Sequence, residues 1–498
     1  MKQTAQNPWN SHMLRLQEAY RKEFEALQSD PEGRQGAQAT LNVSTATYHD
    51  EVIGMGYLPK IYDHAALSAF EAIVAQTYTI LDKITRHYLK DPAYRSLFRF
   101  SPLLEELTLL ESGYDCTIPI SRIDIFLDEQ TGSFKFCEFN TDGSGAMNED
   151  REVVDALTKT PLLQTFSRSH ELVAQELFDP WIECFLQIYQ SSAQAVSQPV
   201  VGIVDYLQSA VINEQLEFRN RFERAGTPCL VCDIASLEYK DGVLYGKDVT
   251  KDHAAHHAPR RLDALYRRAV TFELIQELQN SPEEAHRILA TKQAGSKPLH
   301  GALALIAAVA EQKVCLIGSF ATQVAHSKAI FCLLHHQNTQ TLLTCEEQCF
   351  IKQHVPFTTW LKEDAIDIEA VKNSPEDWII KPVDGYGTVG VHAGKSFDNA
   401  TWSALIDEKL AEDYVIQQYC AQFQTLNTLP LPLENTALAP FNILTGLYCY
   451  GAKLGGVYVR AGQDALIVGF RGGVTLGSLL VDYQASTGAR IRPRALLN

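Results

Sequence analysis

Residues 122–140 have the sequence RIDIFLDEQTGSFKFCEFN, in which two runs of strand-forming residues flank a turn-forming segment. Alternating polar and apolar residues predict a β-strand, and the Asp, Thr and Gly between the runs predict a hairpin turn. The hairpin closed by this turn sets Asp124 opposite Glu138. In the same register, Arg122 lies opposite Asn140. Since residues directly opposite each other share a face, the four polar side chains are expected to lie together.

The same alternation predicts which apolar side chains accompany these four residues. On the first strand, one face carries Arg122, Asp124 and Phe126. On the second strand, one face is predicted to carry Phe134, Phe136, Glu138 and Asn140. Polar residues that continue an apolar stripe more often line a cleft than a solvated surface. A cleft is therefore the favoured interpretation, and a solvated sheet face for Glu138 and Asn140 is the alternative.

Two directly opposed carboxylates repel each other unless a cation lies between them. Oxygen atoms of Asp, Glu and Asn suit Mg²⁺, which usually completes its coordination shell with water and substrate phosphates. The pattern therefore predicts a magnesium–nucleotide site at Asp124, Glu138 and Asn140. The alternative for Arg122 and Asp124 is a structural ion pair.

A second stretch, residues 378–391, has the sequence WIIKPVDGYGTVGV. It predicts a short apolar strand that delivers Lys381 to a glycine-rich loop. Glycines let backbone N–H groups approach phosphate oxygens, and a lysine adds a point charge. The loop is not a Walker A motif, because no Gly-Lys-Ser/Thr closes it. Taken alone, it could equally be a hairpin with flexible glycines. With the first stretch, it predicts that ATP contacts Lys381 and the loop residues Gly385, Tyr386, Gly387 and Gly390.

These two stretches, in this order, resemble the circularly permuted ATP-grasp family, which includes the synthetase domain of glutathionylspermidine synthase and its uncharacterised relatives. The resemblance covers roughly residues 115 to 480. It implies that Arg122 is catalytic and that Asp124, Glu138 and Asn140 hold Mg²⁺. The glycine loop is longer than that of glutathionylspermidine synthase itself, so the substrates of that enzyme are not carried over.

The resemblance also implies roles for residues that are ordinary by themselves. Lys328, before a helix, matches a second phosphate-binding lysine. Gln417 and Gln418 match a hinge pair close to the adenine. Arg460 matches a second active-site arginine, although Arg267, Arg268 and Arg471 compete for that role. The family's closing glycine pair is matched by Arg471-Gly472-Gly473.

The middle of the chain predicts a βαβ unit. Residues 199–205 are an apolar run that ends in an acid, residues 213–222 have helical periodicity, and residues 227–233 predict the next strand. A hairpin with an Asp-Gly turn at 237–245 and a strand at 262–268, which brings two arginines to an edge, follow. Together they resemble the Rossmann-like domain that precedes the ATP-grasp domain in related enzymes.

The expected fold class is therefore α/β (α+β), an ATP-grasp fold in circularly permuted order with a Rossmann-like pre-ATP-grasp domain in mid-chain. Three domains are expected. Residues 1–195 hold an N-terminal helical region and the permuted half of the ATP-grasp domain. Residues 196–325 form the Rossmann-like domain, and residues 326–498 form the rest of the ATP-grasp domain with the lysine strand and the glycine-rich lid.

Composition limits the other possibilities. The 498 residues are 46% hydrophobic and 21% charged, which is ordinary for a globular protein. The formal net charge of −17 argues against general nucleic-acid binding, which needs basic surfaces. There is no apolar signal core and no run of 18 apolar residues, so we expect a cytoplasmic protein with no membrane partner. The 11 cysteines are scattered, as is typical of reduced thiols.

The resemblance implies a carboxylate–amine ligase with ATP and Mg²⁺ as cofactors. A small-molecule or peptide carboxylate would form an acyl phosphate, an amine would attack it, and an amide, ADP and phosphate would be released. The alternatives are an ATP-dependent phosphotransferase on the same scaffold and a non-catalytic nucleotide-binding protein. Two variants follow from the assignment: Lys381→Ala should weaken nucleotide binding, and Asp124→Asn should spare the fold and abolish turnover.

Overall fold

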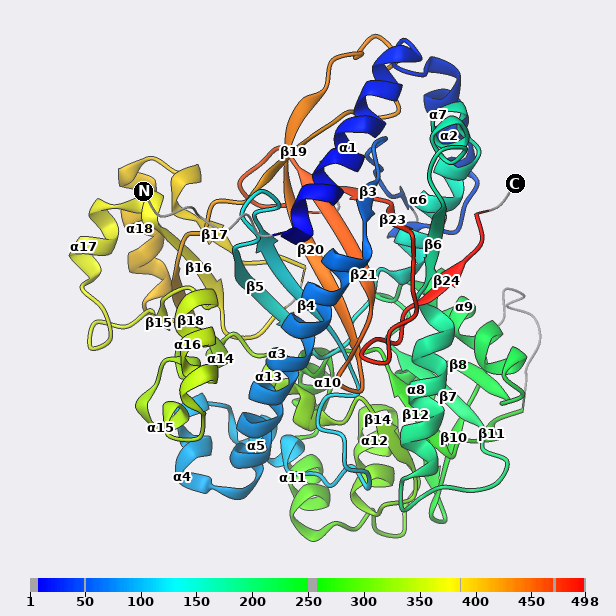
Figure 1. The fold of residues 1–498 in the computed structure, drawn as a ribbon. Coiled ribbons are helices and arrows are strands. Elements are labelled where there is room, and N and C mark those ends of the chain that lie inside the picture. The colour runs from blue at the N-terminus through cyan, green and yellow to red at the C-terminus, as the bar shows by residue number, and fades with distance from the viewer. Residues whose placement is uncertain (1–7, 49–50, 250–257, 386, 469–471, 497–498) are drawn as a thin grey trace.

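The computed structural model describes residues 8–48, 51–249, 258–385, 387–468 and 472–496. Over these residues the chain is mixed α/β and builds six sheets (Figure 1). No helix in these ranges combines the length and apolar character that a bilayer span needs.

The central sheet carries the predicted hairpin. Its strands are β4 (Ile120–Leu127), β5 (Phe134–Asn140), β19 (Gln424–Asn427), β20 (Ala439–Tyr450), β21 (Lys453–Gly462) and β22 (Val474–Leu476). They are antiparallel in the order β22-β21-β20-β4-β5, with β19 paired to β20. The long helix α3 (His64–Lys90) crosses one face of this sheet and buries its apolar stripe there (Figure 1).

The predicted hairpin register is confirmed, but the predicted faces of β5 are wrong. Asp124 pairs with Glu138 while the next residue of β4, Ile125, pairs with Phe136, so Cys137 is an extra residue in β5. Such a β-bulge reverses the alternation of side chains along its strand. The side chains of Phe134 and Phe136 therefore lie in the core, where they pack against Phe350 of α16 (Cys345–His354). The side chains of Glu138 and Asn140 lie on the opposite face, where they line a cavity with Arg122.

The mid-chain prediction of parallel strands is also confirmed. The strands β7 (Val201–Asp205), β8 (Cys229–Asp233), β12 (Ala264–Arg267) and β14 (Cys315–Ile317) form a parallel sheet in the order β14-β12-β7-β8. Alternate residues of these strands enter two separate hydrophobic clusters, so both faces of the sheet are covered. The covering helices are α8 (Phe178–Gln190), α9 (Ile212–Arg224), α10 (Thr271–Leu278), α11 (Pro282–Thr291) and α12 (Gly301–Ala310).

The predicted Asp-Gly hairpin forms beside this sheet. It joins β9 (Glu238–Lys240) to β10 (Val243–Gly246), and both turn residues, Asp241 and Gly242, have positive φ, as a type I′ turn requires. With β11 (Arg260–Arg261) and β13 (Leu299–His300) it makes a small separate sheet.

The lysine strand lies in a third layer. This sheet has the order β15-β18-β16-β17, and its strands are β15 (Thr358–Trp360), β16 (Trp378–Pro382), β17 (His392–Ala393) and β18 (Tyr414–Gln418). The helices α17 (Ile368–Asn373) and α18 (Asn399–Lys409) cover its outer side, where Trp402 is fully buried. Figure 1 shows this layer, in yellow, to one side of β4 and β5. Shorter helices join it to the parallel sheet: α13 (Gln323–His326), α14 (Ala329–Leu334), α15 (Gln337–Gln340) and α16 (Cys345–His354).

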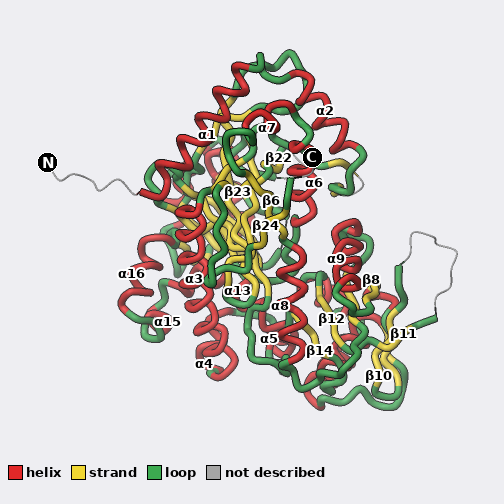
Figure 2. The backbone as a smooth tube through the Cα atoms, turned by 45° about the vertical axis from the view of Figure 1, so that its right-hand side comes forward, coloured by secondary structure: helices red, strands yellow, loops and turns green. Residues whose placement is uncertain are grey.

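The two ends of the chain meet in a fourth layer. The strands β3 (Lys60–Tyr62), β6 (Leu172–Glu176), β23 (Ser478–Val481) and β24 (Arg492–Arg494) form one sheet in the order β24-β6-β23-β3. Around it lie α1 (Pro8–Ala26), α2 (Pro31–Asn42), α6 (Met147–Thr158) and α7 (Pro161–Phe166) (Figure 2). The other short elements are β1 (Thr47–Tyr48), β2 (Glu51–Val52), α4 (Pro92–Arg95) and α5 (Pro102–Thr108).

Candidate active site

A buried ion pair lies at the centre of the site. The guanidinium of Arg122 donates to both carboxylate oxygens of Asp124, with Nε–Oδ1 at 2.7 Å and Nη2–Oδ2 at 2.9 Å. The two residues are 6% and 1% exposed. Burial alone would lower the pKa of Arg122, but Asp124 raises it well above its usual range. Arg122 also donates to the backbone oxygen of Gly145 at 3.0 Å, so hydrogen bonds hold its guanidinium group on two sides.

Asn140 links the two opposed carboxylates. Its Nδ2 lies 3.0 Å from Oδ2 of Asp124 and 3.3 Å from Oε1 of Glu138. An amide nitrogen thus lies between the carboxylates, where the sequence predicts a cation. Mg²⁺ is typically held by one or two carboxylates together with substrate phosphates. Glu138, Asp124 and the amide oxygen of Asn140, once turned over, fit that requirement. The described residues hold no cluster of three or more His, Cys, Asp or Glu side chains that could bind a metal without such a partner.

Two buried lysines face Glu138 from the neighbouring layer. Lys328 precedes α14, and Lys381 lies on β16; each is 8% exposed. Burial would raise the pKa of Glu138, but Lys328, Lys381 and Arg122 together lower it, so the carboxylate stays ionised. Burial lowers the pKa of Lys328. Two lysines brought together out of water need a nearby anion, and a phosphate group would supply more negative charge than Glu138 alone.

The glycine loop begins directly above these lysines. Lys328 Nζ donates to the backbone oxygen of Gly385 at 3.1 Å, and Gln323 Nε2 donates to Asp384 Oδ1 at 2.8 Å. Gly385, Gly387 and Gly390 all have positive φ, a conformation that favours glycine. Tyr386, which the sequence places in the ATP site, lies outside the described residues.

Gln417 supports Lys381 directly. Its Oε1 accepts from Lys381 Nζ at 2.8 Å, and its Nε2 donates to Thr358 Oγ1 at 2.8 Å. Lys381 also donates to the backbone oxygen of the bulged residue Cys137 at 3.2 Å, which ties the lysine strand to β5. Gln417 is 4% exposed, and its neighbour Gln418 is exposed on the other side of the strand.

Arg460 lies on β21, where it contacts the same aromatic ring as Arg122. The two guanidinium carbons lie 5.3 Å (Arg122) and 5.5 Å (Arg460) from the centre of the Tyr458 ring. Arg460 Nε donates to the Tyr458 hydroxyl at 3.1 Å, and this hydroxyl donates to Glu149. Tyr458 thus holds both predicted catalytic arginines beside one another.

A cavity of about 540 Å³ opens in front of these groups. Five of the predicted site residues line it: Arg122, Glu138, Asn140, Gly387 and Arg460. Lys328, Lys381 and Gln417 are not on its wall, so the cavity adjoins the lysine cluster rather than containing it. The hairpin of β1 and β2 closes one side with Tyr48 and Glu51, while the ends of β7 and β12 close another with Asp205 and Arg268.

Arg268 is the most informative cavity residue that sequence reasoning left unassigned. It is 9% exposed, and Nη2 pairs with Glu214 at 2.9 Å, but its Nε and Nη1 are buried without a hydrogen-bond partner. Buried donors without partners are rare, and a water or a polar ligand group is one way to satisfy them. Arg267 differs, since it pairs with Asp142 and donates to the backbone oxygens of Gly318 and Ala269, and so it is structural. Arg471, the other competitor for the role of Arg460, lies outside the described residues.

The loop between β5 and α6 provides a further wall. α6 begins at Met147, with Ala146 as its N-terminal cap residue and no side-chain cap. Ser144 lines the cavity and donates to the backbone oxygen of Asn140. Asn148, in the first turn of α6, donates to the backbone oxygen of Thr45 at 2.9 Å, which ties the start of this helix to the segment before β1.

Gly446 leaves the space that the ion pair occupies. It lies on β20 opposite Asp124, and a methyl group there would lie 2.7 Å from Arg122 Cδ and 2.9 Å from Asp124 Oδ1. Because the bidentate pairing holds both side chains, they cannot move aside without breaking it. We expect Gly446→Ala to lower the free energy of unfolding by about 1–3 kcal/mol in urea denaturation.

The matched control for this substitution is Gly36→Ala. Gly36 lies inside α2, and a methyl group there meets no atom within 4 Å. It should stabilise the protein by about 0.5–1 kcal/mol, because alanine is the better helix former. Equal stability of Gly446→Ala and the wild type would contradict the described packing around the ion pair.

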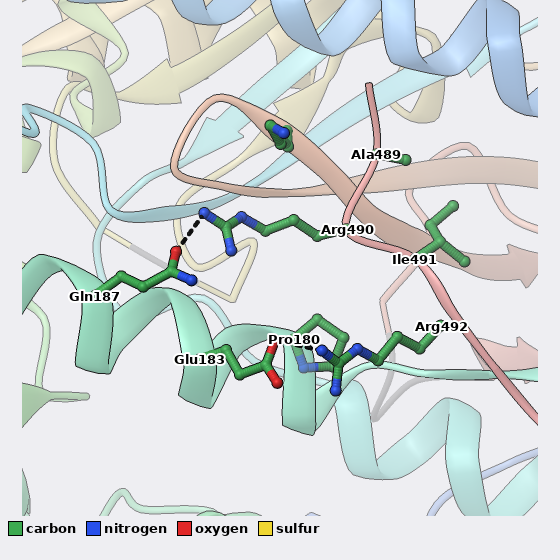
Figure 3. Close-up of a pocket in the computed structure, with 8 residues that line it drawn as sticks. Pro180, Glu183, Gln187, Ala489, Arg490, Ile491 and Arg492 are labelled. Carbon is green, nitrogen blue, oxygen red and sulfur yellow. Dashed lines mark hydrogen bonds and ion pairs between the residues drawn. The ribbon is translucent and has the colours of Figure 1, made fainter. Parts of the chain in front are cut away.

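A second cavity, of about 350 Å³, lies away from this site (Figure 3). It lies between α8 and the C-terminal segment, where Gln187 pairs with Arg490 at 3.0 Å and Glu183 pairs with Arg492. None of the predicted site residues lines it.

Comparison with known proteins supports the fold. No protein-family model and no curated protein matches the sequence. Among solved structures, the chain is similar to a glutathione synthetase-like effector from Globodera pallida in its apo form. The TM-score is 0.53 at 11% sequence identity, and the match covers 90% of this chain and 96% of that one. The chain therefore shares its overall mixed α/β fold with that glutathione synthetase-like protein. At this identity the likeness concerns the fold alone.

A second structure is similar at a lower score. It is a protein from Methylobacillus flagellatus KT provisionally named gamma-glutamylcysteine synthetase, with a TM-score of 0.36 and 11% identity over 82% of this chain and 88% of that one. That score is too low to argue from.

Proposed function

We propose that this protein is an ATP-dependent ligase that joins a carboxylate to an amine, with release of ADP and phosphate. The observation that carries the proposal is the arrangement of two buried lysines, Lys328 and Lys381, around the carboxylate of Glu138. This cluster lies under a glycine loop and beside a cavity with three arginines. The likeness in fold to a glutathione synthetase-like protein supports the same class of reaction.

In this proposal the domains keep the predicted order. The strands with Arg122 and Glu138 come first, a Rossmann-like domain is inserted at 196–325, and the lysine strand follows, which is the circularly permuted ATP-grasp arrangement. That the lysine strand and β5 come from distant parts of the chain and are joined through Lys381 and Cys137 is consistent with this order.

Each group of site residues has its own role in this proposal. Lys328 and Lys381 bind the phosphates of ATP, and the backbone N–H groups of the loop at Gly385, Tyr386, Gly387 and Gly390 cover them. Gln417 holds Lys381 in place at the adenine end, where Gln418 is adjacent. Asp124, Glu138 and Asn140 would hold Mg²⁺, which when bound supplies charge stabilisation to the transferred phosphoryl group.

The carboxylate substrate would lie in the cavity. The unpaired Nε and Nη1 of Arg268 suit a carboxylate group, since charge-assisted bonds from a guanidinium are among the strongest available. Arg122 and Arg460, fixed by Tyr458, would stabilise the negative charge that develops when the amine attacks the acyl phosphate. The closed glycine loop would exclude water from that intermediate.

The proposed function is tested by tracing an oxygen atom of the carboxylate substrate into the released phosphate. Candidate carboxylates and amines are screened for ADP release, and the active pair is repeated with ¹⁸O in the carboxylate. An acyl phosphate leaves one labelled oxygen in the released phosphate. A phosphorylated product without amide would favour the phosphotransferase, and no ADP release from any pair would favour a non-catalytic nucleotide-binding protein.

Nucleotide binding is tested separately by thermal unfolding. Mg-ATP at 100 times its dissociation constant should stabilise the fold by about 2.7 kcal/mol. Lys381→Met should weaken binding by about 10- to 100-fold, since a charge-assisted bond contributes roughly 1.5–3 kcal/mol. Lys352→Met, an exposed lysine on α16, is the matched control. Equal binding by both variants would remove Lys381 from the nucleotide site.

A further inference from the structure

Asp205 lies where the parallel sheet opens toward the cavity. It is the last residue of β7, and the chain continues from β7 to β8 on one side and later to β12 on the other. Ligands of open parallel sheets bind in the crevice at such a reversal, beyond the carboxyl ends of the strands. Asp205 lines the cavity there, beside Arg268, whose backbone N–H donates to Val204 at 2.9 Å.

The carboxyl group of Asp205 is held in one orientation. Its Oδ1 accepts from the backbone N–H of Tyr206 at 2.9 Å, and its Oδ2 accepts from Gln215 Nε2 at 2.5 Å. Gln215 is 1% exposed, so this support is rigid. Each oxygen accepts one bond and has a further lone pair, so either can accept a proton from a group in the cavity.

Burial and the charges around Asp205 together set the pKa of its carboxyl group. Burial raises its pKa to about 7; Arg268 opposes the increase, and Glu273 on α10 adds to it. Glu214 on α9 faces Arg268, and Asp233 ends the neighbouring strand β8. An acid with a raised pKa in a cavity wall has the property required of a general base at neutral pH.

The cavity wall with Asp205 and Arg268 lies close to Arg122. Arg122 donates to the backbone oxygen of Gly145, and a methyl group on Gly145 would lie 2.7 Å from Arg268 Nη2. One residue therefore separates the two guanidinium groups. An amine beside Asp205 lies within the same cavity as Arg268, which would bind the carboxylate, and as Arg122, Glu138 and Asn140.

We propose that Asp205 is the general base of the ligation, and that the second substrate is therefore an aliphatic amine that carries a positive charge at neutral pH. This inference rests on the proposed ligase function. The ammonium group gives one proton to Asp205, and the neutral nitrogen attacks the carbonyl carbon of the acyl phosphate. The C–O bond to phosphate then breaks, and the second proton leaves the nitrogen with the released phosphate.

Hydroxylamine as the nucleophile distinguishes a general base at Asp205 from a residue that only binds the amine. It is a neutral nucleophile at neutral pH, so it attacks an acyl phosphate without a base and forms a hydroxamate. With the active carboxylate, Asp205→Asn should reduce turnover with the amine by about 100- to 10,000-fold. Hydroxamate formation should stay within a few fold of the wild type. Asp233→Asn, at the end of the next strand and outside the cavity, is the matched control and should leave both reactions unchanged.

The wild-type pH profile tests the same point without a variant. Turnover with the amine should fall as the pH drops below about 7, whereas hydroxamate formation should show no such limb. Equal loss of both reactions in Asp205→Asn, or the same limb with both nucleophiles, would make Asp205 a binding or structural residue and overturn the proposal. A wild type that forms neither amide nor hydroxamate from any carboxylate would instead refute the ligase function on which the proposal rests.

Discussion

Asp124→Asn is expected to lower the free energy of unfolding by about 3–5 kcal/mol, because it leaves the buried charge of Arg122 without its counter-ion. The shape of the side chain is unchanged, and one of the two hydrogen bonds from Arg122 can remain. Since Arg122 is 6% exposed and its guanidinium stays charged, water from the cavity can replace only part of the lost carboxylate. Urea denaturation without nucleotide measures the effect. Turnover should be lost as well.

This expectation differs from the one drawn from the sequence, where Asp124→Asn spares the fold. The structure changes it because both carboxylate oxygens already bind Arg122. The double variant Arg122→Met/Asp124→Leu is the informative control, since replacing a whole buried ion pair by apolar side chains is often neutral for stability. If Asp124→Asn is as stable as the wild type, the pair is not the buried bidentate contact described above.

The register of the central hairpin could be predicted because it depends on local information. The turn after Leu127 and the alternation on both sides set Asp124 against Glu138, as observed. The bulge at Cys137 could not be predicted, because nothing in the residues 134–140 marks the extra position. It is explained only by distant contacts: Lys381 donates to the backbone oxygen of Cys137, while Phe134 and Phe136 pack against Phe350 of α16.

The residues that line the cavity could likewise be predicted only in part from the sequence. The run 199–205 and the two arginines at 267–268 were visible in the sequence as strand ends, but which arginine faces the cavity depends on partners far along the chain. Arg267 pairs with the buried carboxylate of Asp142, whereas Arg268 pairs with Glu214 through Nη2 alone and keeps Nε and Nη1 without a partner. The wall made by β1 and β2 had no sequence signal, because a two-residue strand is too short to produce one.

Glu138→Gln is expected to reduce turnover by about 100- to 10,000-fold, since a bound metal ion contributes several kcal/mol to the stabilisation of the transferred phosphoryl group. Glu138 is partly buried and faces the cavity, so the substitution removes a carboxylate charge without disturbing the Arg122–Asp124 pair. The extra thermal stabilisation that Mg²⁺ adds to ATP should disappear. Glu51→Gln, which changes an exposed acid of the same cavity, is the matched control and should retain it.

The pH dependence of stability distinguishes Glu138 from a general loss of charge. The lysines hold its pKa in the folded protein below the ordinary value, so its ionised form stabilises the fold at neutral pH. That contribution is lost as the pH falls through the lowered pKa. Wild type should therefore be more stable than Glu138→Gln at neutral pH, and the difference should vanish in acid. A difference that persists unchanged in acid would mean that Glu138 acts through packing, and its assignment to the metal and lysine cluster would fail.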